Sequence, residues 1–344
     1  MDAVGTENPT VIAELSANHN GSLDRAIALI EQAARAGSDF VKFQHYRPET
    51  ITVKGSSPEL RISGGTQWDG STLWDLYASA MTPWEWTNDL VEACQHHQIG
   101  WLSTPFDESA VDFLEGFDPP FYKVASFEIV NLPLIRYVSG TKKPLVLSTG
   151  MATIEEIDAA FLAAVEGGAS EVILLRTNSG YPAPISEMDL ASIPYMAERW
   201  KTTVGLSDHT LGSTAGIVAL TLGAQVFEKH LTMSRAEGGP DAAFSAEPQE
   251  MKHYIRDLRE AQAAIGTQRF GPSPEEEKSV VLRPSLRAIK RIRKGELLTL
   301  ENVAIRRPSG GLSPDRLQDT LGRRALRPID TGMAITLDQI DLET

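Results

Sequence analysis

The segment PLVLSTGMATIEEIDAAFLAAVEGGASEVILLRT, residues 144–177, contains the unit from which the fold can be predicted. Its two ends, 144–150 and 171–177, are short apolar runs that are typical of buried strands. Between them, 153–168 has apolar residues at the three- and four-residue spacing of a helix. That helix begins with a capping box, in which Thr153 is followed three residues later by Glu156. The segment therefore predicts two parallel strands joined by a helix.

The same unit recurs through the first 270 residues. Eight predicted strands alternate with helix-like stretches and cover 10–16, 40–46, 100–106, 121–126, 144–150, 171–177, 203–209 and 224–231. Eight such units in about 260 residues is the count of a closed (β/α)8 TIM barrel. An open, doubly wound sheet is the alternative, but no GxGxxG follows the first strand. Residues 47–82 are too long for a plain connection and are expected to form an ordered excursion over the barrel mouth.

A second, smaller domain is predicted after the barrel. The barrel is expected to span 1–266, ending with a helix over 247–266. Residues 267–281 are rich in proline and charge and are predicted to be a linker. Residues 282–344 contain short β-like pieces separated by turns and are expected to form a small, mostly β domain. The predicted fold class is therefore α/β, a TIM barrel followed by a small β domain.

Charge and composition exclude several classes of protein. The formal net charge of −14 argues against binding to nucleic acid or to an anionic membrane, which both need a positive surface. A single cysteine, Cys94, excludes an internal disulfide and a four-thiolate zinc site. Neither a signal peptide nor an apolar run of about 18 residues is visible, so a cytoplasmic protein is expected. The charge is split, with −19 on the first 277 residues and +5 from Lys278 onward, which indicates two units with different surfaces.

Two lysines are expected to point into the barrel. On the second predicted strand Lys42 and Gln44 share one face, while Val41 and Phe43 share the other. Lys123 repeats this situation on the fourth strand. A buried ammonium needs a negative partner, which is either a structural carboxylate or an anionic ligand. Two lysines at neighbouring strand ends favour an anionic ligand that carries phosphate or carboxylate.

Two histidines at neighbouring strand ends are candidate metal ligands. His209 and His230 close the seventh and eighth predicted strands, which are adjacent in a closed barrel. Two imidazoles there suit a divalent metal with open positions for substrate oxygen. For a single strand-end histidine, the alternative is acid–base catalysis or a satisfied polar residue. Asp208, Glu228 and Asp241 are close in sequence and favour the metal site.

Small polar residues and a glycine-rich loop complete the predicted mouth. Ser126, Ser148, Thr149 and Asn178 lie at strand ends and suit hydroxyl or phosphate oxygens. The loop SRAEGGPDAAFS, 234–245, follows the last strand and carries Asp241. It is either a flexible connector or a lid over the mouth.

These motifs together resemble those of the sialic acid synthase family. In order, they read IAELSANHNGSLDRA, VKFQ, LSTPFD, YKVASFE, LSTGMAT, GLSDHT and EKHLT. SLRAIKRIRKGE and NVAIRRPSGGLSP, near the C-terminus, are similar to the family's antifreeze-like (SAF, β-clip) domain. The resemblance implies a transferase that condenses phosphoenolpyruvate with an acetamido sugar by C–O cleavage, releasing phosphate and a nine-carbon 2-keto acid.

Two segments are most similar to the pseudaminic acid synthase branch of this family. They read LYASAMTPWEW and SRAEGGPDAAFSAEPQEM. The implied substrate is a 2,4-diacetamido-2,4,6-trideoxy-hexose. N-acetylneuraminate or legionaminate synthesis is the alternative within the family. Outside it, a metal-dependent aldolase or isomerase on the same barrel and a non-catalytic carbohydrate-binding protein remain open.

The resemblance also assigns roles to individual residues. His209 and His230 would bind Mn²⁺ or Mg²⁺, Glu14 would act near the sugar and the attacking water, and Asp241 would lie on the sugar side of the metal. Arg307 would reach into the partner subunit of a domain-swapped homodimer. The residues implied to hold phosphoenolpyruvate and sugar are Lys42, Gln44, Thr104, Lys123, Ser126, Glu128, Ser148, Tyr181 and Ser207.

One position depends on how the motif after the sixth strand is aligned. This chain reads LLRTNSGYPAP there, where the family commonly has a Cys-Thr-Asn-type run before Tyr-Pro. Asn178 matches if the alignment is anchored on Thr-Asn, and Ser179 matches if it is anchored on Tyr181–Pro182. Both residues therefore remain candidates for the polar group at this position.

Overall fold

The computed structural model describes residues 8–63, 65 and 68–341. The chain divides into two compact units, Met1–Gly266 and Thr267–Thr344. The N-terminal residues 1–7, where no signal peptide is expected, and three positions of the predicted excursion lie outside the described residues. Within the described part of the chain, no helix is both long and apolar enough to cross a membrane.

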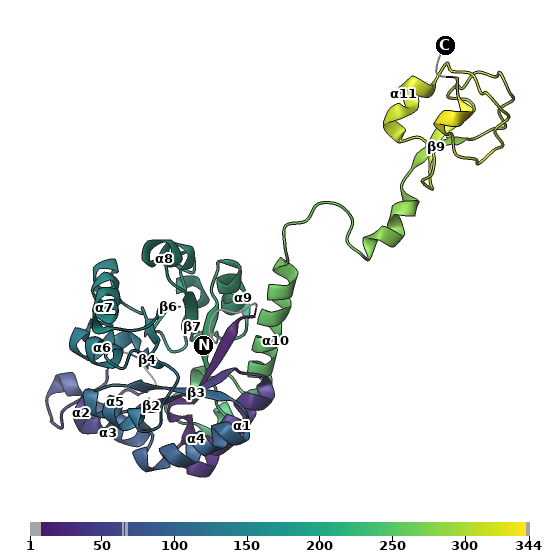
Figure 1. Ribbon diagram of the computed structural model, residues 1–344. Coiled ribbons are helices and arrows are strands. Elements are labelled where there is room, and N and C mark those ends of the chain that lie inside the picture. Colours follow the sequence, from purple (N-terminus) through teal and green to yellow (C-terminus); the bar gives the residue numbers. More distant parts are fainter. Residues whose placement is uncertain (1–7, 64, 66–67, 342–344) are drawn as a thin grey trace. The chain divides into compact units, whose positions relative to one another are not determined.

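The first unit is built around a closed barrel of parallel strands (Figure 1). Each strand pairs with the next, and the last pairs with the first, so the predicted TIM barrel is confirmed. In register, Glu14 lies beside Lys42 on one side and His230 on the other. The strands are β1 Thr10–Glu14, β2 Phe40–His45, β3 Gly100–Pro105, β4 Tyr122–Val124, β5 Leu145–Ser148, β6 Val172–Thr177, β7 Val204–Asp208 and β8 Val226–His230.

Helices surround the barrel and start where the sequence places caps. The Ser22 side chain accepts a hydrogen bond from the Arg25 amide at the start of α1, and Thr153 and Glu156 form the predicted capping box of α7. The helices of the barrel layer are α1 Leu23–Ala36, α4 Thr87–His96, α5 Glu108–Glu115, α6 Leu132–Ser139, α7 Ile154–Gly167, α8 Ser192–Trp200, α9 Thr214–Thr221 and α10 Pro248–Ile265.

One helix is shorter than expected. The stretch 186–200 is predicted as a single helix, but α8 begins only at Ser192. Asp189 adopts a backbone φ of +46°, and a right-handed helix cannot continue through a residue in that region. The segment before it, Ile185–Glu187, is a single 3-10 turn.

The excursion between β2 and β3 contains structure of its own. It includes α2 Pro48–Ile51 and α3 Leu73–Ala80, and an antiparallel bridge joins Arg61 to Thr72. Trp68 Nε1 donates a hydrogen bond to the carbonyl of Pro240 at 2.8 Å. This contact connects the excursion to the glycine-rich loop 234–245.

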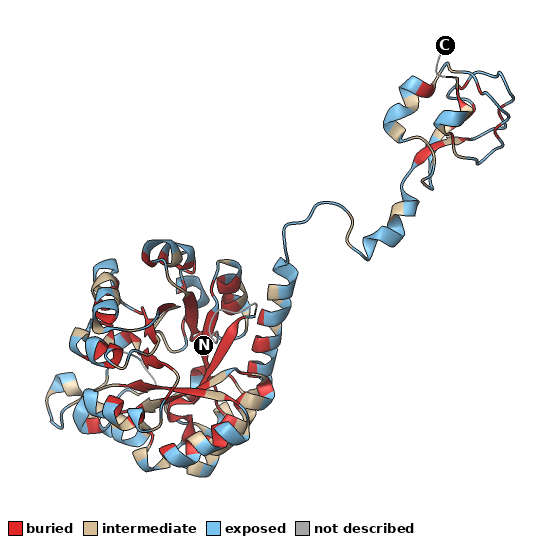
Figure 2. Ribbon diagram, in the orientation of Figure 1, coloured by how far each residue is buried: buried red, intermediate tan, exposed pale blue. Residues whose placement is uncertain are grey.

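The barrel interior changes character along the strands. The strands of the barrel are largely buried (Figure 2). Inside the barrel, an apolar layer is followed, toward the carboxyl ends of the strands, by polar and charged side chains that are also buried. The apolar layer is made by Ile12, Leu102, Phe121, Val146, Ile173, Leu175 and Val226. The polar layer includes Glu14, Lys42, Thr104, Lys123, Ser148, Ser207 and Glu228. The polar layer is where the candidate site lies.

The second unit has a separate small core. Its two-stranded antiparallel sheet pairs β9 Ser285–Ala288 with β10 Val303–Arg306, and α11 Leu317–Thr320 follows. The 3-10 turns of Glu276–Leu282 fall partly in the stretch predicted to be a linker. The core residues are Leu286, Ala288, Ile292, Leu298, Val303, Ala325, Ile329, Ile335 and Ile340.

Candidate active site

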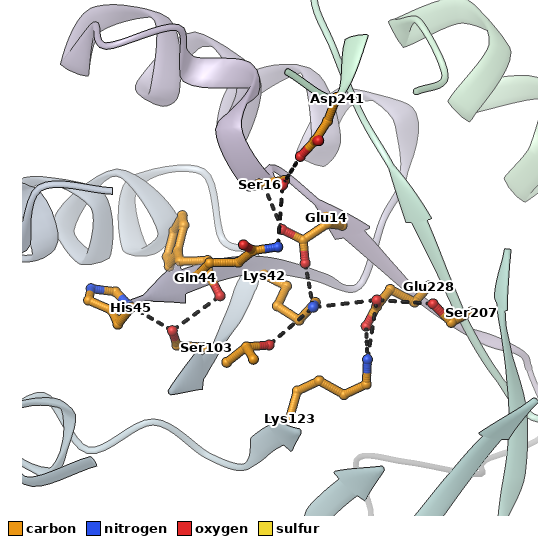
Figure 3. Close-up of polar contacts among 12 residues, drawn as sticks. Glu14, Ser16, Lys42, Gln44, His45, Ser103, Lys123, Ser207, Glu228 and Asp241 are labelled. Carbon is orange, nitrogen blue, oxygen red and sulfur yellow. Dashed lines mark hydrogen bonds and ion pairs between the residues drawn. The ribbon is translucent and has the colours of Figure 1, made fainter. Parts of the chain in front are cut away.

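The centre of the site is a buried network of two lysines and two glutamates (Figure 3). Lys42 Nζ lies 2.5 Å from Glu14 Oε2 and 3.4 Å from Glu228 Oε1. Lys123 Nζ lies 3.2 Å from Glu228 Oε2. Both lysines therefore point into the barrel as strand alternation predicts, and both have the carboxylate partners that the sequence left open. Their binding of an anionic ligand remains a prediction.

Two hydroxyl groups extend this network. Thr104 accepts a hydrogen bond from Lys42 Nζ at 3.1 Å, and Ser207 donates one to Glu228 at 3.2 Å. Both residues come from inward-facing strand positions. They hold the charged groups in place and lie where phosphoenolpyruvate was expected to bind.

Burial and neighbouring charges set the protonation of the network. Burial raises the pKa of Glu14 to about 7, against the lowering effect of Lys42. Burial alone would also raise the pKa of Glu228, but Lys123 and Lys42 together lower it to about 2. Burial lowers the pKa of Lys123 to about 8. Glu14 can thus take up or release a proton near neutral pH, while Glu228 stays ionised.

Two serines, Ser126 and Ser179, lie against Gly150 after β5, and Ser148 is the last residue of that strand. Ser126 Oγ accepts a hydrogen bond from the Gly150 amide at 3.2 Å. A Cβ at Gly150 would lie 2.3 Å from Ser179 Oγ, so only glycine leaves room for that hydroxyl. The hydroxyls of Ser148 and Ser179 are buried and have no hydrogen-bond partner among the described residues. Buried hydroxyls without partners are costly, and a phosphate or carboxylate oxygen would satisfy them.

The structure separates the roles of Asn178 and Ser179. The Asn178 side chain is engaged in its own loop, since it donates to the Glu187 carbonyl and accepts from the Gly180 amide. The Ser179 hydroxyl instead lies against Gly150, as does that of Ser126. This placement favours Ser179 as the polar group at the position that the sequence left undecided.

Glu128 lies on the same side of the mouth, in the 3-10 turn Ser126–Val130 after β4. Its Oε2 atom is buried and has no hydrogen-bond partner among the described residues. Burial raises the pKa of this carboxyl to about 7. Glu128 is therefore a second carboxyl that titrates near neutrality.

His209 and His230 face one another at the ends of β7 and β8. Their ring centroids are 5.4 Å apart. His209 Nδ1 donates to the Asn178 carbonyl at 2.7 Å, so its Nε2 keeps a free lone pair. Burial lowers the pKa of His209 to about 4 and that of His230 well below its usual value, so both rings are neutral at pH 7. His230 Nδ1 is buried without a hydrogen-bond partner among the described residues.

These two imidazoles fit a divalent metal ion as neutral nitrogen ligands with other positions left open. The carboxylates expected beside them do not complete a ligand set. Asp208 points to the opposite face of its strand and pairs with Lys229, and Glu228 is held by the lysines. Within residues 8–63, 65 and 68–341, no group of three His, Cys, Asp or Glu side chains is arranged to hold a metal. Any metal here would take its remaining ligands from substrate or water.

Tyr181 forms an aromatic wall beside the histidines. Its ring centroid lies 4.4 Å from that of His209 and 4.8 Å from that of Phe244. Trp68, from the excursion, contacts the Tyr181 ring in an edge-to-face arrangement at 5.8 Å. Phe244, from the loop 234–245, also contacts the His230 ring at 4.9 Å.

Asp241 is connected to the central network through Ser16, which the sequence analysis did not single out. The Ser16 hydroxyl donates to the Asp241 carboxylate, and Gln44 Nε2 donates to the same hydroxyl at 3.3 Å. The Ser16 amide donates to Glu14 Oε1 at 2.6 Å. One residue thus holds both carboxylates, and burial raises the pKa of Asp241. Only a three-dimensional contact reveals Ser16, because 225 residues separate it from Asp241.

The loop 234–245 is tied down at several points. Asn20 Nδ2 donates to the Gly238 carbonyl at 3.0 Å, Arg25 pairs with Glu237, and Trp68 contacts Pro240. The loop is therefore a structured segment that holds Asp241 at the mouth, not a loose connector.

Arg307 belongs to the second unit. It directly follows β10 and is exposed. Its contribution to a partner's barrel remains a prediction.

The fold and the site define a class of protein, a TIM barrel whose mouth combines buried cations, carboxylates and a pair of neutral imidazoles. Such a set suits an anionic substrate and a metal ion. The chain belongs to the NeuB family, whose model matches residues 29–270, and residues 283–341 match the SAF domain. These matches confirm the resemblance to sialic acid synthases and to their antifreeze-like domain.

Several known proteins similar to this chain are sugar-acid synthases. Pseudaminic acid synthase of Campylobacter jejuni is 39% identical over 325 residues, which are 94% of this chain and 94% of that protein. N,N'-diacetyllegionaminic acid synthase of the same species is 36% identical and covers 92% of this chain and 96% of its own. The solved N-acetylneuraminic acid synthetase from Leptospira borgpetersenii, in complex with citrate, superposes with a TM-score of 0.71 at 28% identity. That match covers 80% of this chain and 92% of the other.

Proposed function

We propose that the chain condenses phosphoenolpyruvate with a 2,4-diacetamido-2,4,6-trideoxy-hexose to form pseudaminic acid and phosphate. The observation that carries this proposal is the pair of buried lysines in a barrel mouth that also holds partnerless serine hydroxyls, in a chain 39% identical to a pseudaminic acid synthase. Lysines and hydroxyl donors together suit the phosphate and carboxylate of phosphoenolpyruvate. Synthesis of legionaminate or N-acetylneuraminate is the alternative, because the legionaminic acid synthase is 36% identical.

The proposed reaction forms one carbon–carbon bond, and at carbon 2 it replaces the oxygen bound to phosphate with the oxygen of a water molecule. Carbon 3 of phosphoenolpyruvate attacks the aldehyde carbon of the open-chain sugar, and the aldehyde oxygen takes up a proton. Water adds to carbon 2, and the resulting tetrahedral centre loses phosphate by cleavage of its C–O bond. The oxygen of that water becomes the keto oxygen of the product.

The charged network divides the tasks in this reaction. Lys42 and Lys123 bind the anionic groups of phosphoenolpyruvate, with Glu228 keeping both ammonium groups in position. Glu14, with a pKa of about 7, accepts a proton from the attacking water. Asp241, held by Ser16, binds the sugar. Ser126, Ser148 and Ser179 donate to phosphate oxygens.

His209 and His230 would hold a divalent metal, Mn²⁺ or Mg²⁺, and when bound it would supply Lewis-acid polarisation of the sugar aldehyde. The chain's own part is to present two neutral imidazoles. The Asn178 carbonyl fixes the proton of His209 on Nδ1, and burial keeps both rings uncharged. A domain-swapped homodimer, in which Arg307 contacts the sugar, is part of the same proposal. The cytoplasmic location stays a prediction.

The test is an assay of phosphate release from phosphoenolpyruvate with three sugars, with mass spectrometry of the products. The sugars are the 2,4-diacetamido-2,4,6-trideoxy altrose, the corresponding legionaminate precursor, and N-acetylmannosamine. We expect the highest kcat/KM with the altrose sugar. A preference for another sugar would place the chain in that branch. Sugar turnover without consumption of phosphoenolpyruvate would favour the distant alternative, a metal-dependent aldolase or isomerase.

A further inference from the structure

A second buried ion pair lies behind the two histidines, on the outer face of the barrel wall. Asp208 on β7 and Lys229 on β8 are direct partners in the strand register. Both residues are buried, with exposed fractions of 1% for Asp208 and 3% for Lys229. Lys229 Nζ lies 3.1 Å from Asp208 Oδ2. Each residue immediately precedes one of the candidate metal ligands. Since side chains alternate along a strand, the pair points outward where His209 and His230 point inward.

Both members of the pair also hold the residue that follows His209. Asp208 Oδ1 accepts hydrogen bonds from the Thr210 amide at 2.9 Å and from its hydroxyl at 2.7 Å. Lys229 Nζ donates to the Thr210 carbonyl at 2.6 Å. His209 is therefore fixed from both sides, by Asp208 before it and by the bonded Thr210 after it. The bond to Lys229 connects this turn to the strand that carries His230.

Helix α10 covers the pair. The ammonium group of Lys229 lies 5.0 Å from the centroid of the Tyr254 ring, within the range of a cation–π contact. This contact limits how far the lysine can move and completes its surroundings. The strand ends, the turn after β7 and the helix thus converge on one ammonium group.

Stability alone does not account for a buried ion pair at this place. Taking two charges out of water is costly, and apolar pairs of similar size are often as stable or more stable. Several other outward positions of this barrel wall are filled by apolar side chains, such as Val11, Val41 and Leu174. The ion pair instead fixes the backbone of the turn at Thr210, because its hydrogen bonds are directional whereas apolar contacts are not.

We infer that Asp208 and Lys229 are positioning residues, which hold the His209 imidazole in the orientation that faces His230. This inference rests on the proposed role of the two histidines as metal ligands. Neither Asp208 nor Lys229 touches the inner face of the barrel, so both act through the backbone of the turn.

The experiment compares four forms of the full-length chain. They are the wild type, Lys229→Met, the double variant Asp208→Leu/Lys229→Met, and Ser103→Ala as the matched control. Ser103 and His45 form another buried polar pair on the outer wall, between β2 and β3, with the Ser103 hydroxyl 2.7 Å from His45 Nδ1. The measurements are Mn²⁺ affinity by calorimetry, Tm, and ¹⁵N NMR of the histidine side chains without metal.

We expect Lys229→Met to lower both Tm and Mn²⁺ affinity, the affinity by about 10- to 100-fold, as for loss of partners that orient metal ligands. The double variant should recover Tm but not Mn²⁺ affinity, and its His209 should lose the single Nδ1–H form that the hydrogen bond to the Asn178 carbonyl implies for the wild type. Ser103→Ala should lower Tm and leave Mn²⁺ affinity unchanged. This pattern would separate an effect on the orientation of His209 from an effect on the stability of the fold.

Two results would overturn the inference. One is a double variant that binds Mn²⁺ as tightly as the wild type, and the other is a double variant with an unchanged His209 NMR signature. If the wild type binds no Mn²⁺, the proposed metal role is wrong, and the His209 signature alone then decides whether the pair positions this ring.

Discussion

Glu14 and Lys42 show how single residues in this barrel gain reactivity. Both residues are buried, and Lys42 Nζ lies 2.5 Å from Glu14 Oε2. A carboxyl in such surroundings keeps its proton to higher pH, since burial opposes its charge. A group with a pKa of about 7 can both accept and return a proton under physiological conditions.

The first prediction concerns pH. Glu14 must be ionised to accept a proton, so kcat/KM should fall as pH drops below about 7. Lys123 must be protonated to bind an anion, so kcat/KM should also fall as pH rises above about 8. We expect a bell-shaped profile of phosphate release. Glu14→Gln should lower kcat by about 10²- to 10⁴-fold at every pH.

Glu128 provides the control for this profile, because the pKa of its carboxyl is also about 7. If Glu14 causes the fall in kcat/KM at low pH, the acidic limb of the profile, that fall should remain in Glu128→Gln. If the acidic limb disappears in Glu128→Gln and persists in residual activity of Glu14→Gln, the base is Glu128.

The second prediction distinguishes Ser179 from Asn178. Loss of a hydrogen bond to a charged group costs about 1.5–3 kcal/mol, so Ser179→Ala should raise the KM for phosphoenolpyruvate by roughly 10- to 100-fold. Asn178→Ala removes hydrogen bonds within its own loop and should mainly lower Tm. The reverse pattern, measured by steady-state kinetics and thermal melting, would favour the alignment anchored on Thr-Asn.

At this scale, the sequence predicts which way a side chain points but not which group it meets. Period-two alternation correctly places Lys42 and Lys123 inside the barrel. The same rule, applied to β8, would have placed Glu228 beside them. It could not reveal Ser16 as the partner of Asp241, because a loop brings these distant residues together. Asp208 was grouped with the histidines by sequence proximity, yet alternation puts it on the opposite face.

At the scale of elements, the loop 234–245 matters as much as the strands. It is held against the turn after β1 by Asn20 and Arg25, and against the excursion by Trp68. These contacts keep Asp241 within reach of Ser16. The position of a proposed sugar-binding group therefore depends on how two loops meet.

The third prediction tests this dependence with Gly239→Ala. Gly239 has a φ of +124°, and a Cβ there would lie 2.2 Å from Asn20 Oδ1. The substitution should displace the loop and raise the sugar KM while leaving the KM for phosphoenolpyruvate nearly unchanged. Gly238→Ala is the control. An alanine at this φ of +70° would also be strained, but its Cβ would have no atom within 4 Å. Equal effects of the two variants on sugar KM would show that backbone strain, not the contact with Asn20, is responsible.

Regular elements were predictable from sequence because their causes are local. Apolar periodicity and caps such as Thr153 lie within the element that they define. The start of α8 was not, because it depends on the backbone conformation of Asp189. Nor was the contact between Trp68 and Pro240, which joins segments about 170 residues apart and has no periodic signal.

At the scale of the whole molecule, the chain consists of two units with opposite charge. Residues 267–344 carry a formal charge of +3, and residues 1–266 carry −17. Opposite charges attract more strongly at low ionic strength. A homodimer that uses this attraction should weaken as salt is added.

The fourth prediction tests the swapped homodimer by mixing two inactive variants. Arg307→Ala should impair use of the sugar, and Glu14→Gln should impair chemistry. If each site combines one chain's barrel with the other chain's Arg307, a mixed dimer contains one intact site. A one-to-one mixture should then regain about a quarter of wild-type activity after subunit exchange at high salt.

Arg306→Ala is the matched control, because Arg306 is the exposed neighbour of Arg307. It should retain sugar use. A mixture that regains no activity, although sedimentation shows mixed dimers, would contradict a site shared between chains. A chain that sediments as a monomer at every salt concentration would contradict the dimer itself.

The change from an apolar to a charged layer inside one barrel bears on how such a chain evolves. The layer below is filled by residues such as Ile12 and Val146, whereas Lys123 and Glu228 occupy the layer above. Buried charged residues that serve catalysis often lower the stability of the folded protein. Laboratory selection for thermal stability alone should therefore enrich apolar replacements of Lys123 and Glu228. The selected variants should have a higher Tm and no activity.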